Sequence, residues 1–361
     1  MSQPVTIEIA GKSITAFRGD RLLDALHLAG LSLPGDCRNG TCGLCPLRLV
    51  EGQVAGGSTA AGGILACRAR VESNLRLELG ERATVAPTAG FVAAITDLTL
   101  DVTEVTISLA GPYSWRPGQY AHVTFTGFPA RAYSTTVALD GSDRPASLRL
   151  HVARLDGGVV SSELGRRINV GHPVCLEGPL GSAVLEPNST RRLVLFSSGT
   201  GFAPIWAIAD AALRENAMRR IVVVSGTRAL ENLYMAEALE RMSRCANVTV
   251  LPVTAQPQSL TPIIKTGTPV DFAAMIAPGD AVHAAGPGEM VQAIGAFAGA
   301  AGATFRADPF TPSATADDRW LAQAARRFAP VPAERPSTLA ERLEGVRRRA
   351  ASIAAEQLNR R

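Results

Sequence analysis

The alternation of apolar and polar positions in the first eighty residues predicts a compact β-rich unit with one helix. Residues 5–17 alternate on both sides of a Gly-Lys turn, which indicates a β-hairpin. Asp20 can cap the helix that follows. Four leucines of this helix are expected to face inward: Leu22, Leu23, Leu26 and Leu28. Further strands are expected at residues 47–54, 64–67 and 75–79.

The pattern changes twice further along the chain. Between residues 91 and 185, short alternating runs separated by turn signals are typical of a small antiparallel β-barrel. From residue 192, apolar runs at 193–196, 221–224, 248–251 and 281–284 alternate with helical segments, which extend to residue 212, over 232–242 and near 290. This alternation predicts a doubly wound α/β domain with a parallel sheet.

A C-terminal extension, residues 311–361, follows these three patterned regions. It is expected to form a short helix at 317–328, a proline-rich linker and an amphipathic helix that begins at the Thr338-x-x-Glu341 capping box. Residues 311–361 hold 10 arginines and 6 acidic residues, whereas residues 1–310 hold 26 basic and 26 acidic residues. The extension is therefore either a solvated appendage or a docking segment for the body, another subunit or an acidic partner.

Charge and cysteine use narrow the class of protein. The balanced body has no basic face of the kind that binds nucleic acid. The start of the chain lacks a signal-peptide pattern, and the longest uncharged run, residues 193–209, contains a Ser-Ser-Gly-Thr-Gly loop that suits phosphate better than a membrane. A cytoplasmic protein with no membrane partner is therefore expected. In the reducing cytoplasm, six cysteines favour metal ligation over disulfides.

Four cysteines have a spacing that predicts an iron–sulfur centre. Cys37, Cys42, Cys45 and Cys67 form the pattern C-x4-C-x2-C-x21-C, which suits a [2Fe–2S] cluster. Gly40 and Gly43 fit a loop that needs positive φ around a cluster. Zinc and purely structural thiols remain as alternatives, although structural zinc sites favour paired C-x2-C spacings. A Rieske centre is disfavoured because this loop contains no histidine.

The N-terminal region resembles a plant-type ferredoxin of the β-grasp fold, with a shortened interval between Cys45 and Cys67. Within the barrel, the run Arg-Ala-Tyr-Ser from Arg131 is similar to the R-x-Y-S signature of the ferredoxin–NADP reductase superfamily. The resemblance implies that Arg131 meets the FAD phosphates, that Tyr133 packs on the flavin ring and that Ser134 approaches flavin N5. An arginine can grip a diphosphate with two hydrogen bonds, and an aromatic face excludes water.

A second flavin motif and a nucleotide loop follow in the order typical of that superfamily. The run from Val152 to Ser161, which begins at the end of the expected strand at 147–152, resembles the second flavin motif. Gly178-Pro-Leu-Gly181 resembles the turn that closes the barrel. The FAD contacts that this resemblance implies are His151, Val152, Gly157, Gly158, Val160 and Ser161. His151 has an alternative interpretation as an ordinary core or surface histidine.

The Gly-x-Gly loop after residue 198 resembles the nicotinamide-dinucleotide loop, whose helix N-terminus favours a diphosphate. The nucleotide contacts that the resemblance implies are Gly199, Thr200, Gly201, Ala203, Pro204, Thr227, Arg228, Gly286, Pro287 and Met290. Arg228 leaves NADPH possible, but NADH is expected from the domain order. Ala285 stands where the superfamily usually has cysteine. Phe310 is the candidate aromatic cover of the flavin, or simply a core residue.

The whole order resembles the iron–sulfur flavoprotein reductase components of bacterial oxygenases, such as those of phenol hydroxylase and naphthalene dioxygenase. The implied domains are a ferredoxin domain at 1–86, an FAD-binding barrel at 87–188, an NAD(P)-binding domain at 189–310 and a basic helical extension at 311–361. Electrons are expected to pass from NADH through FAD and the [2Fe–2S] cluster to a terminal oxygenase or an intermediate acceptor protein. The alternatives are a non-oxygenase acceptor such as a deoxysugar dehydrase and, more remotely, a redox sensor.

Overall fold

The protein is described here by a computed structural model. It describes residues 3–31, 33, 40, 45–59, 62–79, 87–142, 147–257 and 263–310. The chain divides into two compact units, Met1–Val85 and Ala86–Arg361. Cys37, Cys42, Gly43 and the extension at 311–361 lie outside the described residues.

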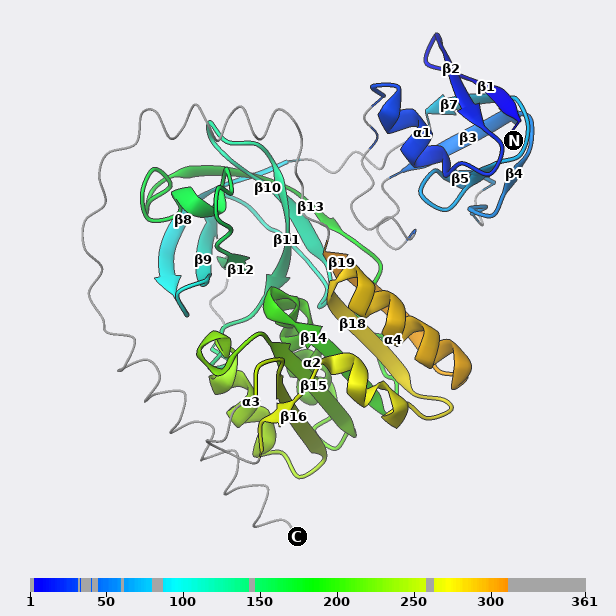
Figure 1. Ribbon diagram of the computed structural model, residues 1–361. Helices are drawn as coiled ribbons and strands as arrows, with labels where there is room; N and C mark the ends of the chain where they lie inside the picture. The colour runs from blue at the N-terminus through cyan, green and yellow to red at the C-terminus, as the bar shows by residue number, and fades with distance from the viewer. Residues whose placement is uncertain are drawn as a thin grey trace. The chain divides into compact units, whose positions relative to one another are not determined.

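The first unit is a small mixed sheet with one helix across it (Figure 1). Five strands of this sheet have the order β2-β1-β7-β3-β5, with β1 parallel to β7 and antiparallel to β2, and β4 and β6 pair in a separate two-stranded sheet. The elements are β1 (Pro4–Ile9), β2 (Lys12–Phe17), α1 (Leu22–Leu28), β3 (Pro46–Glu51), β4 (Val54–Ala55), β5 (Ile64–Leu65), β6 (Arg70–Val71) and β7 (Leu75–Leu79). The predicted hairpin is confirmed, and Ala10 and Gly11 make its turn with φ of 49° and 74°.

Two details of α1 were predicted wrongly. Asp20 does not cap the helix, because its Oδ2 accepts a hydrogen bond from the Phe17 amide (2.9 Å) and closes the preceding turn. Leu22, Leu23 and Leu26 are buried, but Leu28 is 90% exposed. At about 100° per residue, Leu28 lies roughly 200° around the helix from Leu26 and therefore points away from the sheet.

The second unit begins with a closed barrel of six antiparallel strands, as predicted. Their order is β10-β11-β12-β9-β8-β13. The strands are β8 (Thr88–Asp97), β9 (Val102–Leu109), β10 (Tyr120–Phe125), β11 (Arg131–Thr136), β12 (Ser147–Ala153) and β13 (Pro173–Leu180). Alternate residues point inward, so that Val123, Phe125, Leu148 and Leu150 fill the barrel.

The barrel is followed by a six-stranded sheet in which every pair is parallel, with the order β17-β16-β15-β14-β18-β19. Its elements are β14 (Leu193–Ser198), α2 (Phe202–Glu215), β15 (Ile221–Thr227), α3 (Ala236–Ser243), β16 (Val248–Thr254), β17 (Lys265–Thr266), β18 (Ala281–Pro287), α4 (Gly288–Ala300) and β19 (Thr304–Phe310). The 3-10 segments η1 (Ser161–Glu163), η2 (Gly199–Gly201), η3 (Leu230–Asn232) and the longer η4 (Pro269–Met275) complete the unit. The strand β19 was not predicted, and α3 starts four residues later than expected because Asn232 ends the η3 turn.

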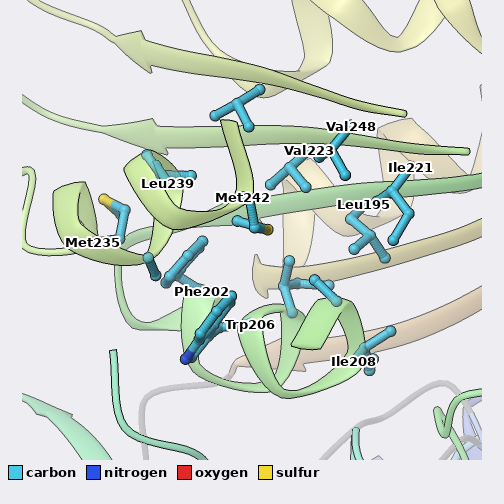
Figure 2. Close-up of a cluster of buried hydrophobic side chains, with 14 of the residues drawn as sticks. Leu195, Phe202, Trp206, Ile208, Ile221, Val223, Met235, Leu239, Met242 and Val248 are labelled. Carbon is cyan, nitrogen blue, oxygen red and sulfur yellow. The ribbon is translucent and has the colours of Figure 1, made fainter. Parts of the chain in front are cut away.

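Helix α2 packs between the sheet and the end of the barrel strand β11. Phe202 and Trp206 stack with ring centroids 6.5 Å apart, and Figure 2 shows them among the buried side chains of this core. The Trp206 indole donates a hydrogen bond to the Ala138 carbonyl (2.9 Å), and the Thr136 hydroxyl donates one to the Ala203 carbonyl (2.8 Å). These bonds fix the barrel against the sheet within the second unit.

Candidate functional site

Two of the four predicted cluster ligands lie next to each other in the first unit. Cys45 precedes β3 and Cys67 follows β5, and the antiparallel pairing of these strands brings the two residues together. Both are buried, and the Cys67 amide donates to the Cys45 sulfur (3.4 Å). A hydrogen bond from an amide to a cysteine sulfur is a contact that tunes the reduction potential of an iron–sulfur cluster. The two described cysteines therefore fit such a group.

Gly40 has a backbone conformation in this loop that favours glycine. Its φ is +89°, and a Cβ there would lie 2.5 Å from the Arg68 Cδ. Positive φ is costly for other residues, which confirms the expectation that the loop needs glycine at this position.

The R-x-Y-S motif lies at the start of strand β11, and its successive side chains point to opposite faces of the strand. Tyr133 packs against the barrel core, and burial raises the pKa of its phenol although the charge of Arg131 opposes the change. Ser134 points to the opposite face, where its hydroxyl donates to the Asp308 carboxylate (3.1 Å). Arg131 donates to the neighbouring Ala130 carbonyl (2.8 Å).

Asp308 is a candidate site residue that sequence reasoning missed. It lies in β19, opposite Ala285 of β18, and its contact with Ser134 joins residues 174 positions apart. Phe310 ends the same strand opposite Pro287 and is partly buried. The resemblance of residues 305–310 to the terminal segment of the superfamily singled out Phe310, but it did not single out Asp308.

The second flavin motif makes a tight turn after β12. Gly157 has φ of +74°, and a Cβ on Gly158 would overlap the Ser161 hydroxyl. That hydroxyl accepts a hydrogen bond from the Leu155 amide (3.1 Å), and Val160 and Ser161 are both buried. The turn leaves no room for a side chain at Gly158, and Gly157 has a backbone conformation that favours glycine.

His151 and Val152 lie at the end of β12, and both are buried. Among the described residues neither ring nitrogen of His151 has a hydrogen-bond partner, and Nε2 lies 3.5 Å from the Glu104 carboxylate. Burial raises the pKa of Glu104, but nearby His151 and Arg149 lower it more and hold it below its usual value. Nε2 therefore has the Glu104 carboxylate nearby, whereas Nδ1 is a buried polar atom without a partner among the described residues, which fits a polar group such as a flavin.

The predicted nucleotide loop lies where β14 and β18 end, at the switch point of the sheet. Gly199 has φ of +55°, and η2 leads directly into α2. A Cβ on Gly201 would overlap the Ala285 carbonyl oxygen, and one on Gly286 would lie 3.0 Å from the Ser198 carbonyl oxygen. The two glycine loops are therefore in backbone contact and form a cradle that suits a dinucleotide.

The remaining predicted nucleotide residues surround this cradle. Thr200 is partly exposed on η2, whereas Ala203 and Pro204 are buried in the first turn of α2. Met290 is buried beneath Gly286. Thr227 ends β15, and its hydroxyl donates to the Ala229 carbonyl (3.0 Å), whereas Arg228 is exposed. Of Thr227 and Arg228, only Arg228 has an exposed side chain that a nucleotide can reach.

A ferredoxin-like unit, a flavin-type barrel and a parallel nucleotide sheet together define an iron–sulfur flavoprotein oxidoreductase. Residues 5–72 match the 2Fe-2S iron-sulfur cluster binding domain, and residues 195–295 match the oxidoreductase NAD-binding domain. The chain belongs to the family of ferredoxin–NAD(P)+ reductase components of oxygenase systems. Its cofactors are a [2Fe–2S] cluster, FAD and a nicotinamide dinucleotide.

Relatives support this assignment over most of their length. The chain is 30% identical over 265 residues, 70% of its length and 80% of the relative's, to the ferredoxin–NAD(P)+ reductase component of the naphthalene 1,2-dioxygenase/salicylate 5-hydroxylase systems of Ralstonia sp.. It is 28% identical over 275 residues, 71% of its length and 77% of the relative's, to the reductase component of phenol 2-monooxygenase from Pseudomonas sp..

Solved structures support the same fold. An Amycolatopsis cytochrome P450 reductase superposes with a TM-score of 0.60 and 27% identity over 86% of this chain and 100% of that one. The described residues contain no helix long and apolar enough to cross a membrane.

Proposed function

We propose that this chain takes electrons from NADH and delivers them singly to a separate oxygenase component, and that it does so in the cytoplasm. The observation that carries the proposal is the contact between Ser134 and Asp308, which joins the flavin-motif strand to the edge of the nucleotide sheet. The relatives named above are reductase components of such systems. The proposed domains are residues 1–86 for the cluster, 87–188 for FAD and 189–310 for the nucleotide, followed by the extension 311–361.

The residues of the site would hold the cofactors and fix the orientation of the groups around them. Arg131, Tyr133 and the turn at Gly157 and Gly158 would hold FAD on the barrel, and the four cysteines would hold the cluster. When bound, FAD converts the electron pair of a nicotinamide into the single electrons that a [2Fe–2S] cluster accepts. Asp308 holds the Ser134 hydroxyl in one orientation, so that this group is fixed before the nucleotide arrives.

The absorbance spectrum and two acceptors test the proposal together. The purified protein should show flavin and [2Fe–2S] absorbance and should reduce both ferricyanide and cytochrome c with NADH. Addition of the purified oxygenase component should couple NADH oxidation to substrate hydroxylation. A protein that binds both cofactors but oxidises no NADH would contradict the proposed function.

Loss of the contact between Ser134 and Asp308 should slow flavin reduction. A hydrogen bond to a charged group is worth about 1.5–3 kcal/mol, so Asp308→Ala is expected to lower the limiting rate in stopped-flow mixing with NADH about tenfold or more. Asp308→Asn keeps an acceptor for the Ser134 hydroxyl and should lose less. Equal rates for wild type and Asp308→Ala, at equal FAD content, would show that the contact has no role.

The exposed Arg228 should matter for NADPH and little for NADH. A 2′-phosphate contact would contribute about 1.5–3 kcal/mol, or about ten- to a hundredfold. Arg228→Ala is therefore expected to leave kcat/KM for NADH nearly unchanged and to weaken any activity with NADPH. Comparison of kcat/KM for both nucleotides measures this, and a wild-type enzyme that prefers NADPH would overturn the choice of NADH.

A further inference from the structure

A seam between the barrel and the nucleotide sheet contains contacts that none of the motifs accounts for. The seam consists of Asp101 and His151 on the barrel side and Asn232 and Tyr234 on the sheet side. The Asn232 amide donates to the Asp101 carboxylate (2.8 Å), 131 residues away in sequence. The Tyr234 ring meets the His151 ring edge-on, with centroids 5.2 Å apart and planes at 85°. All four residues lie within the second unit.

On the barrel side, the seam is attached to the second flavin motif. The Asp101 backbone carbonyl accepts a hydrogen bond from the Arg154 amide (2.7 Å), directly before the turn that contains Gly157. The other carboxylate oxygen of Asp101 accepts a hydrogen bond from the Thr99 hydroxyl (2.7 Å). Asp101 therefore connects the expected FAD diphosphate turn with Asn232.

On the sheet side, the seam is attached to the loop that follows β14, at Gly199, and to the loop that follows β15, at Ala229. Asn232 accepts a hydrogen bond from the Ala229 amide (3.2 Å), next to Arg228. The buried Tyr234 donates its hydroxyl to the Gly199 carbonyl (3.4 Å), and burial, with the charge of Asp101, raises the pKa of that hydroxyl so that it stays protonated. The two loops expected to hold the dinucleotide are thus both linked to the barrel through this seam, by Asn232 and by Tyr234.

We propose that Asp101 and Asn232 are positioning residues that set the nicotinamide dinucleotide in register with the flavin. The inference rests on the FAD and nucleotide sites proposed above. The nucleotide loops keep hydrogen bonds of their own without the seam, including the bond from the Thr227 hydroxyl to the Ala229 carbonyl. Loss of the seam therefore changes the orientation of the nucleotide against the flavin more than its affinity.

An exchange of the two side chains gives a sharp test, because it conserves every hydrogen bond. In Asn232→Asp alone, two carboxylates face each other across the seam. In the double variant Asp101→Asn with Asn232→Asp, the new amide donates to the new carboxylate. The Thr99 hydroxyl and the Ala229 amide then still find acceptors. Glu231→Gln is the matched control, since Glu231 is an exposed neighbour in the same turn.

Four measurements on the full-length holoenzyme separate positioning from binding and from folding. These are the limiting rate of flavin reduction by NADH, the long-wavelength charge-transfer absorbance of the reduced flavin with NAD+, the Kd for NAD+ by calorimetry, and the thermal midpoint. We expect Asn232→Asp to lower the rate by about tenfold or more and to weaken the charge-transfer band, since misplacement by about 1 Å is costly. The Kd should change less than threefold, and the double variant should recover most of the rate and the band.

Three results would overturn the proposal. These are an unchanged rate and band in Asn232→Asp, a Kd weakened as much as the rate, or a double variant with a wild-type thermal midpoint that recovers neither rate nor band. If Asn232→Asp is too unstable to measure, Asp101→Ala and the double variant decide the question by the same criteria. Failure of the wild-type protein to show flavin reduction by NADH would instead contradict the proposed function.

Discussion

Replacement of Cys45 by serine is expected to reduce cytochrome c reduction to the background rate while ferricyanide reduction largely survives. Cys45 is buried beside Cys67, and its sulfur accepts the Cys67 amide (3.4 Å). A serine oxygen is a harder ligand than a thiolate and does not replace it in a cluster held by four cysteines. Ferricyanide can take electrons at the flavin, whereas cytochrome c is expected to depend on the cluster.

The experiment needs the iron content, the FAD content and both acceptor activities of the variant. Cys175→Ser is the matched control, because Cys175 lies in β13 of the barrel and outside the C-x4-C-x2-C-x21-C pattern. The control should keep both activities. If both activities fell together in Cys45→Ser while FAD stayed bound, the cluster would not lie after the flavin in the electron path.

Features that depend on neighbouring residues could be predicted from the sequence. The hairpin of β1 and β2 follows from local alternation around a turn, and the glycine loop after β14 follows from an apolar run that ends in Gly-x-Gly. The three folds and their order are confirmed for the same reason. The roles of the individual site residues stay predictions.

Features that depend on distant parts of the chain were missed. Strand β19 contains a proline and an arginine and has no clear alternation, and it forms because β18 offers it a full-length parallel edge. Asp308 becomes a candidate only because that edge brings it to Ser134. The bond between Asn232 and Asp101 likewise joins segments 131 residues apart, so that neither residue stands out in its own segment.

Replacement of Gly201 by alanine is expected to lower the limiting rate of flavin reduction by NADH about a hundredfold, because it displaces the nucleotide loop by an amount that such a site does not tolerate. A Cβ at this position would overlap the Ala285 carbonyl oxygen and would lie 2.5 Å from the carbonyl carbon and 2.8 Å from the Gly286 nitrogen. All three atoms belong to the backbone of β18, which pairs with strands on both sides. The loop must therefore move, since a side-chain rotation cannot relieve the overlap.

Gly288→Ala is the matched control for this variant. Gly288 starts α4 immediately after the same loop, but a Cβ there has no atom within 4 Å and the residue does not have positive φ. The control should therefore bind NAD+ and reduce the flavin as the wild type does. Reduction by dithionite, followed by electron transfer to cytochrome c, bypasses the nucleotide and should be equal in all three proteins. A normal rate with NADH in Gly201→Ala would mean that the dinucleotide binds away from the junction of β14 and β18.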